Sequence, residues 1–253
     1  MVRMPFRLLS FDLDGTLLGR PESTERFQRA WNAVPLGIRP LLVYNTSRSV
    51  DDTRTLLAAG RLPEPDYIVG SMGTDLYSSL YLISAGFRAR LRNSWNCGQI
   101  EEIVGRLPGI RRQPAEFANE FKSSWYWEDA PQQHVVELTA KLQLLGLQAM
   151  IVYSCRRFLD VIPALAGKGN ALAWICQRLG IAMNQVIVAG DTANDRSMFE
   201  LEDVRGILVG NALPELRAAC DPQRTFAADA EMADGVLEGM RHFGLLPAEP
   251  IGN

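Results

Sequence analysis

Five short apolar runs, each ending in small or polar residues, most constrain the fold of this chain. They are FRLLSF, RPLLVY, PDYIVG, NQVIVAG and RGILVG. Because apolar and polar residues do not alternate along them, we expect strands that are buried on both faces. Segments with helical periodicity lie between or after them, namely STERFQRAWNAV, SVDDTRTLLAAG, GKGNALAWICQRLG, ALPELRAAC and DAEMADGVLEGMRHFG. Strands that alternate with helices predict an α/β fold with three layers and a Rossmann-like parallel sheet.

The middle of the chain has a different pattern. Between about residues 81 and 155 the polar and aromatic content rises. GQIEEIVGRLPG and APQQHVVELTAKLQLLG are typical of amphipathic helices, whereas NEFKSSWYWED and LQAMIVYSCRRFLDVIP are typical of strands or hairpins. We therefore expect an α+β cap domain over 83–158, inserted between two halves of the core domain, 1–82 and 159–253.

The composition excludes several classes of protein. The net charge is −3 and no Lys/Arg-rich tract is present, so neither nucleic acid nor a membrane is the expected partner. No apolar run is long enough for a membrane span, and the N-terminus does not resemble a signal peptide, so we expect a cytoplasmic protein. The four cysteines form no C-x-x-C pair, and neither of the two histidines adjoins a nucleophile. Carboxylates, lysine and a hard metal ion are the expected means of catalysis.

Two aspartates, Asp12 and Asp14, follow the first apolar run in the sequence FDLDGT. If the strand ends in a turn at Gly15, both carboxylates face the crevice beyond the carboxyl end of the strand. Considered alone, the pair is equally typical of a turn with two solvated acids.

Three further strand ends or loops carry polar groups. Thr46 and the backbone N–H of Ser47 suit an anion site at a helix start, although a simple helix cap is the alternative. Lys168 opens a helix in AGKGNALAW, which does not fit a P-loop. Another buried run ends at Asp191, and Asn194 and Asp195 follow within one turn. Such a concentration of acids at a buried strand end is costly unless a cation neutralises it.

The four groups together, in this order, resemble the motifs of the haloacid dehalogenase superfamily. The resemblance extends to the sucrose-phosphate phosphatase family, which includes mannosylfructose-phosphate phosphatases. It covers nearly the whole chain through DYIVGSMGTDLY, NEFKSSWYWED, VYSCRRFLDVIP and ADGVLEGMRHFGLL. LLVYNTSRSVDD, FKSSW and VGNALPEL are more similar to the mannosylfructose-phosphate branch than to the cyanobacterial sucrose-phosphate branch.

The resemblance implies a mechanism for the acidic residues. Asp12 would be the nucleophile that forms an aspartyl-phosphate, and Asp14 would be the general acid and then the general base. Mg²⁺ would bind the carboxylates of Asp12 and Asp191 and the backbone carbonyl of Asp14, and Asp195 would orient a metal-bound water.

The resemblance also implies a phosphate site. Thr46, the N–H of Ser47, Lys168 and Asn194 would hold the phosphoryl oxygens. Two residues depart from the pattern of the family, because Ser47 and Ala193 stand where glycine is common. Both departures affect the geometry of a loop and remove no catalytic group.

The cap that the resemblance implies would close over the crevice and select the sugar. For each candidate sugar contact, surface polarity or core packing is an equally good explanation. The candidates in the cap are Lys122, Ser123, Trp125 and Arg156, and those in the core are Thr74 and Asp75.

The expected function is Mg²⁺-dependent hydrolysis of sucrose 6-phosphate or mannosylfructose 6-phosphate. A broad hexose-phosphate phosphatase, a phosphohexomutase and a non-catalytic partner of a sugar-phosphate synthase remain alternatives. The expected partner is a small-molecule sugar phosphate, and association with the cognate synthase stays open. We expect a monomer.

Overall fold

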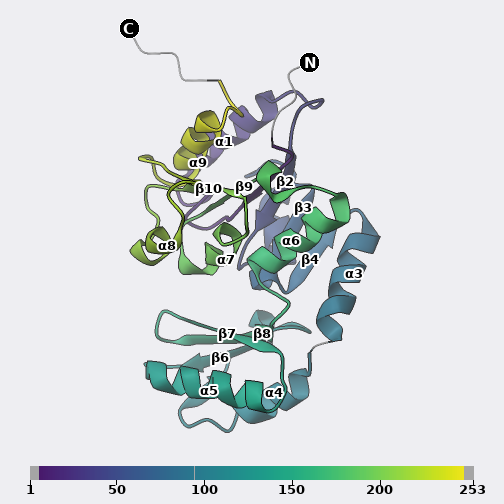
Figure 1. Ribbon diagram of the computed structural model, residues 1–253, viewed down its shortest axis with the longest axis vertical. Helices are drawn as coiled ribbons and strands as arrows, with labels where there is room; N and C mark the ends of the chain where they lie inside the picture. The colour runs from purple at the N-terminus through teal and green to yellow at the C-terminus, as the bar shows by residue number, and fades with distance from the viewer. Residues whose placement is uncertain (1–5, 94, 248–253) are drawn as a thin grey trace. The chain divides into compact units, whose positions relative to one another are not determined.

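The computed structural model describes residues 6–93 and 95–247, which belong to two compact units (Figure 1). Met1–Ile83 and Lys168–Asn253 make up the first unit, and Ser84–Gly167 makes up the second. The expected cap range of 83–158 left most of strand β8 (Phe158–Pro163) in the core domain. In the structure β8 pairs with two strands of the second unit, so this unit continues to Gly167.

Within the described residues, the first unit is built on a seven-stranded sheet in the order β11-β10-β9-β1-β2-β3-β4. Every neighbouring pair in it is parallel except β3 and β4, which are antiparallel. The predicted parallel core is therefore confirmed, whereas the short edge strand β4 was not predicted. The strands are β1 (Leu8–Phe11), β2 (Leu41–Asn45), β3 (Tyr67–Gly70), β4 (Asp75–Ser78), β9 (Val186–Gly190), β10 (Arg205–Leu208) and β11 (Thr225–Ala227).

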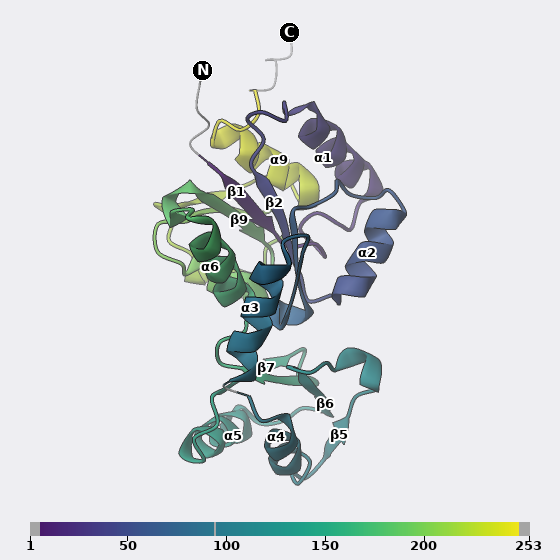
Figure 2. The same ribbon diagram turned by 90° about the vertical axis from the view of Figure 1, so that its right-hand side faces the viewer.

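Helices cover both faces of this sheet. Figure 2 shows α2 and α6 on opposite sides of the strands, which gives the three expected layers. Helix α3 (Tyr81–Arg92) spans the boundary between the two units. The other helices of the first unit are α1 (Pro21–Ala33), α2 (Val50–Ala58), α6 (Lys168–Leu179), α7 (Arg196–Phe199), α8 (Pro214–Ala219) and α9 (Met232–His242). No described helix has the length and apolar character needed to cross a membrane.

The core of the first unit is centred on β1. All four residues of this strand are buried, as its unbroken apolar run predicted. The ring of Phe11 lies 6.2 Å from that of Phe27 on α1, and Phe27 stacks on Trp31 at 6.3 Å. Each such buried side chain contributes about 1.5–3 kcal/mol through removal of apolar surface from water. This packing holds the carboxyl end of β1 in a fixed position.

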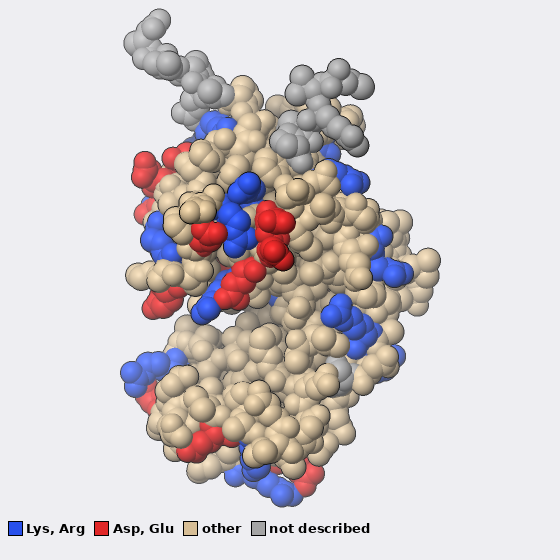
Figure 3. Space-filling model, viewed as in Figure 1, with Lys and Arg blue, Asp and Glu red and all other residues tan. Residues whose placement is uncertain are grey.

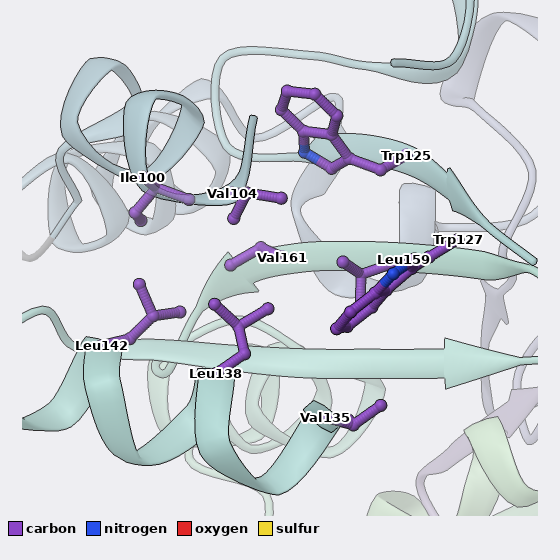
Figure 4. Packing of buried hydrophobic residues seen from close by; sticks show 9 residues of the cluster. All are labelled: Ile100, Val104, Trp125, Trp127, Val135, Leu138, Leu142, Leu159 and Val161. Atoms are coloured by element: carbon purple, nitrogen blue, oxygen red, sulfur yellow. The ribbon is translucent and has the colours of Figure 1, made fainter. Parts of the chain in front are cut away.

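The second unit contains, among its described residues, an antiparallel four-stranded sheet in the order β5-β6-β8-β7. Side chains of β6 and β8 meet those of helices α4 and α5 in an apolar cluster (Figure 4). Because strand residues alternate between faces, Trp125 and Trp127 of β6 both point into this cluster. The remaining elements are α4 (Cys97–Val104), β5 (Ile110–Arg112), β6 (Ser123–Trp127), α5 (Gln132–Leu144) and β7 (Ala149–Ser154).

Basic and acidic side chains are mixed on the surface of the first unit. On the face drawn in Figure 3, blue and red groups lie beside one another in its charged region. Two of the ion pairs join α1 and its preceding residue to the start of α9, namely Arg20–Glu231 and Arg26–Asp234. Exposed pairs of this kind are screened by water and contribute little to stability, so burial at the sheet dominates it.

We predict that Leu9→Ala lowers the free energy of unfolding by about 2–5 kcal/mol, because it leaves a cavity beneath the central strand. Leu9 is 0% exposed, whereas Leu36 of the same unit is 82% exposed. The control variant Leu36→Ala should therefore change stability by no more than about 0.5 kcal/mol. Urea denaturation measures both, and equal effects of the two substitutions would contradict the assignment of the core.

Candidate active site

The polar strand ends of the sequence meet at one edge of the sheet. Asp12 follows β1, and Asp191 follows β9. These strands are parallel neighbours, with Phe11 opposite Ala189, so their carboxyl ends lie together. Lys168 begins α6, and its ammonium bonds to Asp12. The start of this helix therefore lies at the same edge of the sheet. The fold thus unites residues that are far apart in the sequence.

Within the described part of the chain, a cluster of buried carboxylates forms the centre of the site. One oxygen atom from each of Asp12, Asp191 and Asp195 lies within 4.8 Å of the others. The ammonium of Lys168, which is 1% exposed, donates to Asp12 Oδ1 and Asp195 Oδ1 at 2.6 Å each. It also lies 3.4 Å from Asn194 Oδ1. One lysine cannot balance three ionised carboxylates, so this all-oxygen donor set fits a hard divalent cation such as Mg²⁺.

The protonation equilibria show the same excess of negative charge. Burial raises the pKa of Asp12 to about 7; Lys168 opposes the rise, and the neighbouring carboxylates add to it. Burial and Asp195 raise the pKa of Asp191 to about 6, with Lys168 again opposing. Burial tends to lower the pKa of Lys168, but Asp12 and Asp195 outweigh this and raise it, so the ammonium is retained. A bound cation would favour the ionised carboxylates.

Asp195 is held by backbone donors as well as by Lys168. Its Oδ2 accepts from the N–H groups of Asp191 and Thr192 at 3.0 and 3.1 Å. The chain approaches so closely here that a Cβ at Gly190 would lie 2.5 Å from the Asp195 side chain. Glycine is therefore required at the end of β9, and the Asp195 carboxylate has little freedom to move.

Asp14 occupies a different environment from Asp12. Its carboxylate is exposed and accepts two hydrogen bonds from Arg48, at 2.7 Å from Nε and 2.6 Å from Nη2. Gly15 makes the divergence possible, because its φ of +81° belongs to the left-handed region. A Cβ at Gly15 would also lie 2.1 Å from Asp191 Oδ2. The two aspartates of the DLDG sequence are thus physically distinct.

Sequence reasoning missed Arg48. It belongs to the same polar group as Thr46 and Ser47, and its position two residues after Thr46 was the available signal. Its backbone N–H donates to Thr46 Oγ1 at 3.1 Å, so the turn that holds Thr46 also directs Arg48. Ser49 caps α2 by accepting from the N–H of Asp52, as the expected helix start implied.

The polar candidates around Thr74 lie near β3 and β4. Thr74 is buried and its hydroxyl donates to the carbonyl of Ser71 at 2.9 Å. Asp75 begins β4 opposite Gly70 and is half-buried. The Thr74 hydroxyl therefore makes a hydrogen bond within its own turn.

The candidates of the second unit lie in three different environments. Trp125 packs in the apolar cluster and donates from Nε1 to Ser123 Oγ at 2.8 Å, as the packing alternative expects. Arg156 is exposed in the turn between β7 and β8 and pairs with Asp129 at 2.9 Å.

Lys122 makes a largely buried ion pair with Asp160, at 3.5 Å. The same carboxylate accepts from Ser124 Oγ at 2.6 Å. Sequence reasoning missed Asp160, because an isolated acid in an apolar strand gave no sign of its partner on β6.

Comparison with known proteins identifies the family. The sequence profile described as Sucrose-6F-phosphate phosphohydrolase matches residues 5–244. This chain belongs to that sucrose-phosphatase family. A mannosylfructose-phosphate phosphatase from Agrobacterium fabrum is 43% identical over 245 residues, which cover 96% of this chain and 99% of the relative.

The solved structure of one related protein agrees with this membership of the sucrose-phosphatase family. A sucrose-phosphatase from Synechocystis, solved with sucrose and phosphate, is 27% identical with a TM-score of 0.85. The match covers 98% of this chain and 100% of that one. A haloacid dehalogenase-like hydrolase from Bacillus subtilis shares the fold, with 15% identity, a TM-score of 0.66 and coverage of 96% and 93%.

We predict a pH-dependent stability of the EDTA-treated protein that arises from the carboxylate cluster. The pKa of Asp191 is about 6 in the folded state and near 3.8 ordinarily, so its stabilising contribution is complete below about pH 4. That contribution is lost as the pH rises through about 6. The Asp191→Asn variant should therefore become progressively more stable than the wild type over this interval. Chemical denaturation at several pH values measures this difference, and a difference that stays constant would contradict the assignment.

Proposed function

We propose that the chain is a Mg²⁺-dependent phosphatase of a fructose-containing disaccharide phosphate, either sucrose 6-phosphate or mannosylfructose 6-phosphate. The buried cluster of Asp12, Asp191 and Asp195 around Lys168 is the observation that carries the phosphatase part. The similarity to mannosylfructose-phosphate phosphatase over 99% of that protein supports the choice of substrate class.

The metal ligands would be the carboxylates of Asp12 and Asp191 and the backbone carbonyl of Asp14. Their oxygen atoms suit Mg²⁺, and Asp195 beside them would orient a water molecule on the ion. When bound, Mg²⁺ supplies positive charge that offsets repulsion between the carboxylates and a phosphate dianion. Lys168, at the start of α6, supplies a second positive charge beside Asp12.

Asp12 would act as the nucleophile. A carboxylate oxygen of Asp12 forms a bond to phosphorus while the bond from phosphorus to the sugar oxygen breaks. Asp14 gives a proton to the departing sugar oxygen, and the product of this step is an aspartyl-phosphate. Asp14 then takes a proton from water, which attacks phosphorus and restores the Asp12 carboxylate.

The surroundings of Asp14 suit this exchange of roles. Its exposed carboxylate accepts two hydrogen bonds from Arg48, so both of its oxygen atoms act as acceptors, as a base requires. Donation of a proton in the first step requires at least one of the Arg48 bonds to be given up. Thr46, the N–H of Ser47, Lys168 and Asn194 would meanwhile hold the phosphoryl oxygens.

The sugar contacts would come from the remaining polar candidates. Trp125 is removed from this set, because its ring packs in the apolar cluster of the second unit. The Lys122 ammonium has N–H donors besides the one directed at Asp160, so Lys122 is the sugar contact that we favour in the second unit. The proposed partner is thus a small-molecule sugar phosphate.

We predict that Asp12→Asn lowers phosphate release by roughly 10⁴-fold or more while the fold is retained, because an amide is not a nucleophile for phosphorus. Asp203→Asn makes the same chemical change at an exposed position and serves as the control. Phosphate release and circular dichroism measure activity and fold. Activity in Asp12→Asn equal to that of the control would eliminate the mechanism.

We predict that Mg²⁺ restores activity lost to EDTA, and that the two fructose-containing substrates are preferred. Phosphate release from sucrose 6-phosphate, mannosylfructose phosphate, trehalose 6-phosphate and glucose 6-phosphate tests both statements. One of the first two should exceed the others by about tenfold or more in kcat/KM. Equal efficiency with glucose 6-phosphate would indicate a broad hexose-phosphate phosphatase. A requirement for a bisphosphate would indicate a mutase, and no turnover at all would indicate a non-catalytic partner.

A further inference from the structure

The loop after β10 contacts both acidic loops of the site, although it carries no carboxylate. Asn211 Nδ2 donates to the carbonyl of Gly15 at 2.8 Å. Two residues later, the N–H of Leu213 donates to the carbonyl of Asp191 at 2.7 Å. One short segment therefore touches the loop that follows β1 and the loop that follows β9.

The contact with Gly15 constrains the backbone next to Asp14. The N–H of Gly15 donates to the carbonyl of Leu18 at 2.9 Å, and its own carbonyl accepts from Asn211. Both peptide groups of Gly15 are thus held. Because the peptide unit is planar, the bond made by the Gly15 N–H also sets the direction of the Asp14 carbonyl.

Gly15 lies so close to Asp191 that small rotations matter. A Cβ in its place would lie 2.1 Å from Asp191 Oδ2, and Thr16 Oγ1 approaches Asp191 Oδ1 at 3.5 Å. Rotation of the Gly15 backbone would move the Asp14 carbonyl and displace Asp191. The Asn211 bond resists that rotation from outside the loop.

Asn211 is itself fixed by a second bond. Its Oδ1 accepts from the N–H of Met232 at 2.8 Å, and Met232 has an unusual positive φ of 54°. The Met232 side chain lies against Gly19, where a Cβ would be 2.6 Å from Met232 Sδ. Asn211 and Met232 therefore contact the two ends of the segment from Gly15 to Gly19.

We propose that Asn211 is a positioning residue for the metal site, which it reaches through Gly15. By holding the Gly15 carbonyl, Asn211 fixes the Asp14 carbonyl against the Asp191 carboxylate in the arrangement that binds Mg²⁺. This inference rests on the proposed function, because it assumes that these groups are metal ligands. Residues that orient metal ligands in this way typically affect metal affinity or activity by about 10- to 100-fold.

Two substitutions of Asn211 separate its two bonds. Asn211→Ala removes both of them. Asn211→Asp keeps an acceptor for the N–H of Met232 but cannot donate to the Gly15 carbonyl. Ser23→Ala is the matched control, because Ser23 Oγ accepts from the N–H of Asp234 in the same first turn of α9 at 2.9 Å and makes no bond to Gly15.

The experiment is titration calorimetry of Mg²⁺ binding to the full chain, together with kcat and KM for its preferred sugar phosphate. Asn211→Ala and Asn211→Asp should each bind Mg²⁺ about tenfold or more weakly. The weakening in Asn211→Asp would occur despite an added negative charge. At saturating Mg²⁺ the two Asn211 variants should keep a KM for the sugar phosphate within about twofold of the wild-type value and should have a lower kcat. Ser23→Ala should behave as the wild type in both measurements.

Three results would overturn the inference. In the first, both Asn211 variants bind Mg²⁺ as the wild type does, and the proposed function then stands without it. In the second, only Asn211→Ala is impaired, which assigns Asn211 to the fold through Met232. In the third, the wild type binds no Mg²⁺, and the proposed function fails as well. If Asn211→Ala does not fold, the Mg²⁺ affinity of Asn211→Asp compared with that of Ser23→Ala tests the inference by itself.

Discussion

The ammonium of Lys168 lies between the carboxylates of Asp12 and Asp195, with Asp191 beside them, and the surrounding sheet has to hold this concentration of charge in place. Like charges at this density repel one another strongly when they are buried. The apolar strands β1 and β9 hold Asp12 and Asp191 in place because their own residues are fully packed. The stability of the sheet thus balances the repulsion within the site, as is common at functional sites.

The same charge balance separates the two aspartates of the DLDG sequence. Asp12 points to Lys168 and the acidic cluster, whereas Asp14 points outward to Arg48. In the proposed mechanism the first of these carboxylates attacks phosphorus beside a cation. In the same proposal the second carboxylate exchanges a proton with the sugar oxygen and with water. A turn at Gly15 places these two environments two residues apart.

The sequence was sufficient to predict the groups that lie at strand ends. Apolar runs revealed the parallel core, and the position of a polar cluster at the end of a run predicted that Asp12 and Asp191 lie together, whereas Lys168 was joined to them through the resemblance to a family. The second unit was located less well, because the expected boundary at residue 158 divided LQAMIVYSCRRFLDVIP, which the sequence had indicated as strands or a hairpin of the middle block. Pairing of β8 with β6 and β7 places the whole of that stretch in the second unit.

Contacts made by single side chains over long distances could not be predicted. Asn211 and Gly15 are far apart in the chain, and neither carries a pattern that points to the other. The face to which Trp125 points also depends on the register of β6, since a shift of one residue would reverse it. Such contacts follow from the packed structure rather than from periodicity.

The stereochemical course at phosphorus tests the central claim, transfer of the phosphoryl group to a carboxylate of the chain, most directly. Each in-line displacement inverts the configuration of phosphorus, so two successive displacements restore it. The substrate is a sugar thiophosphate made chiral at phosphorus with two oxygen isotopes, and it is hydrolysed in water that carries the third isotope. The chiral inorganic thiophosphate that is released should show overall retention of configuration. Overall inversion would mean that water attacks the substrate directly, and it would contradict the role assigned to Asp12.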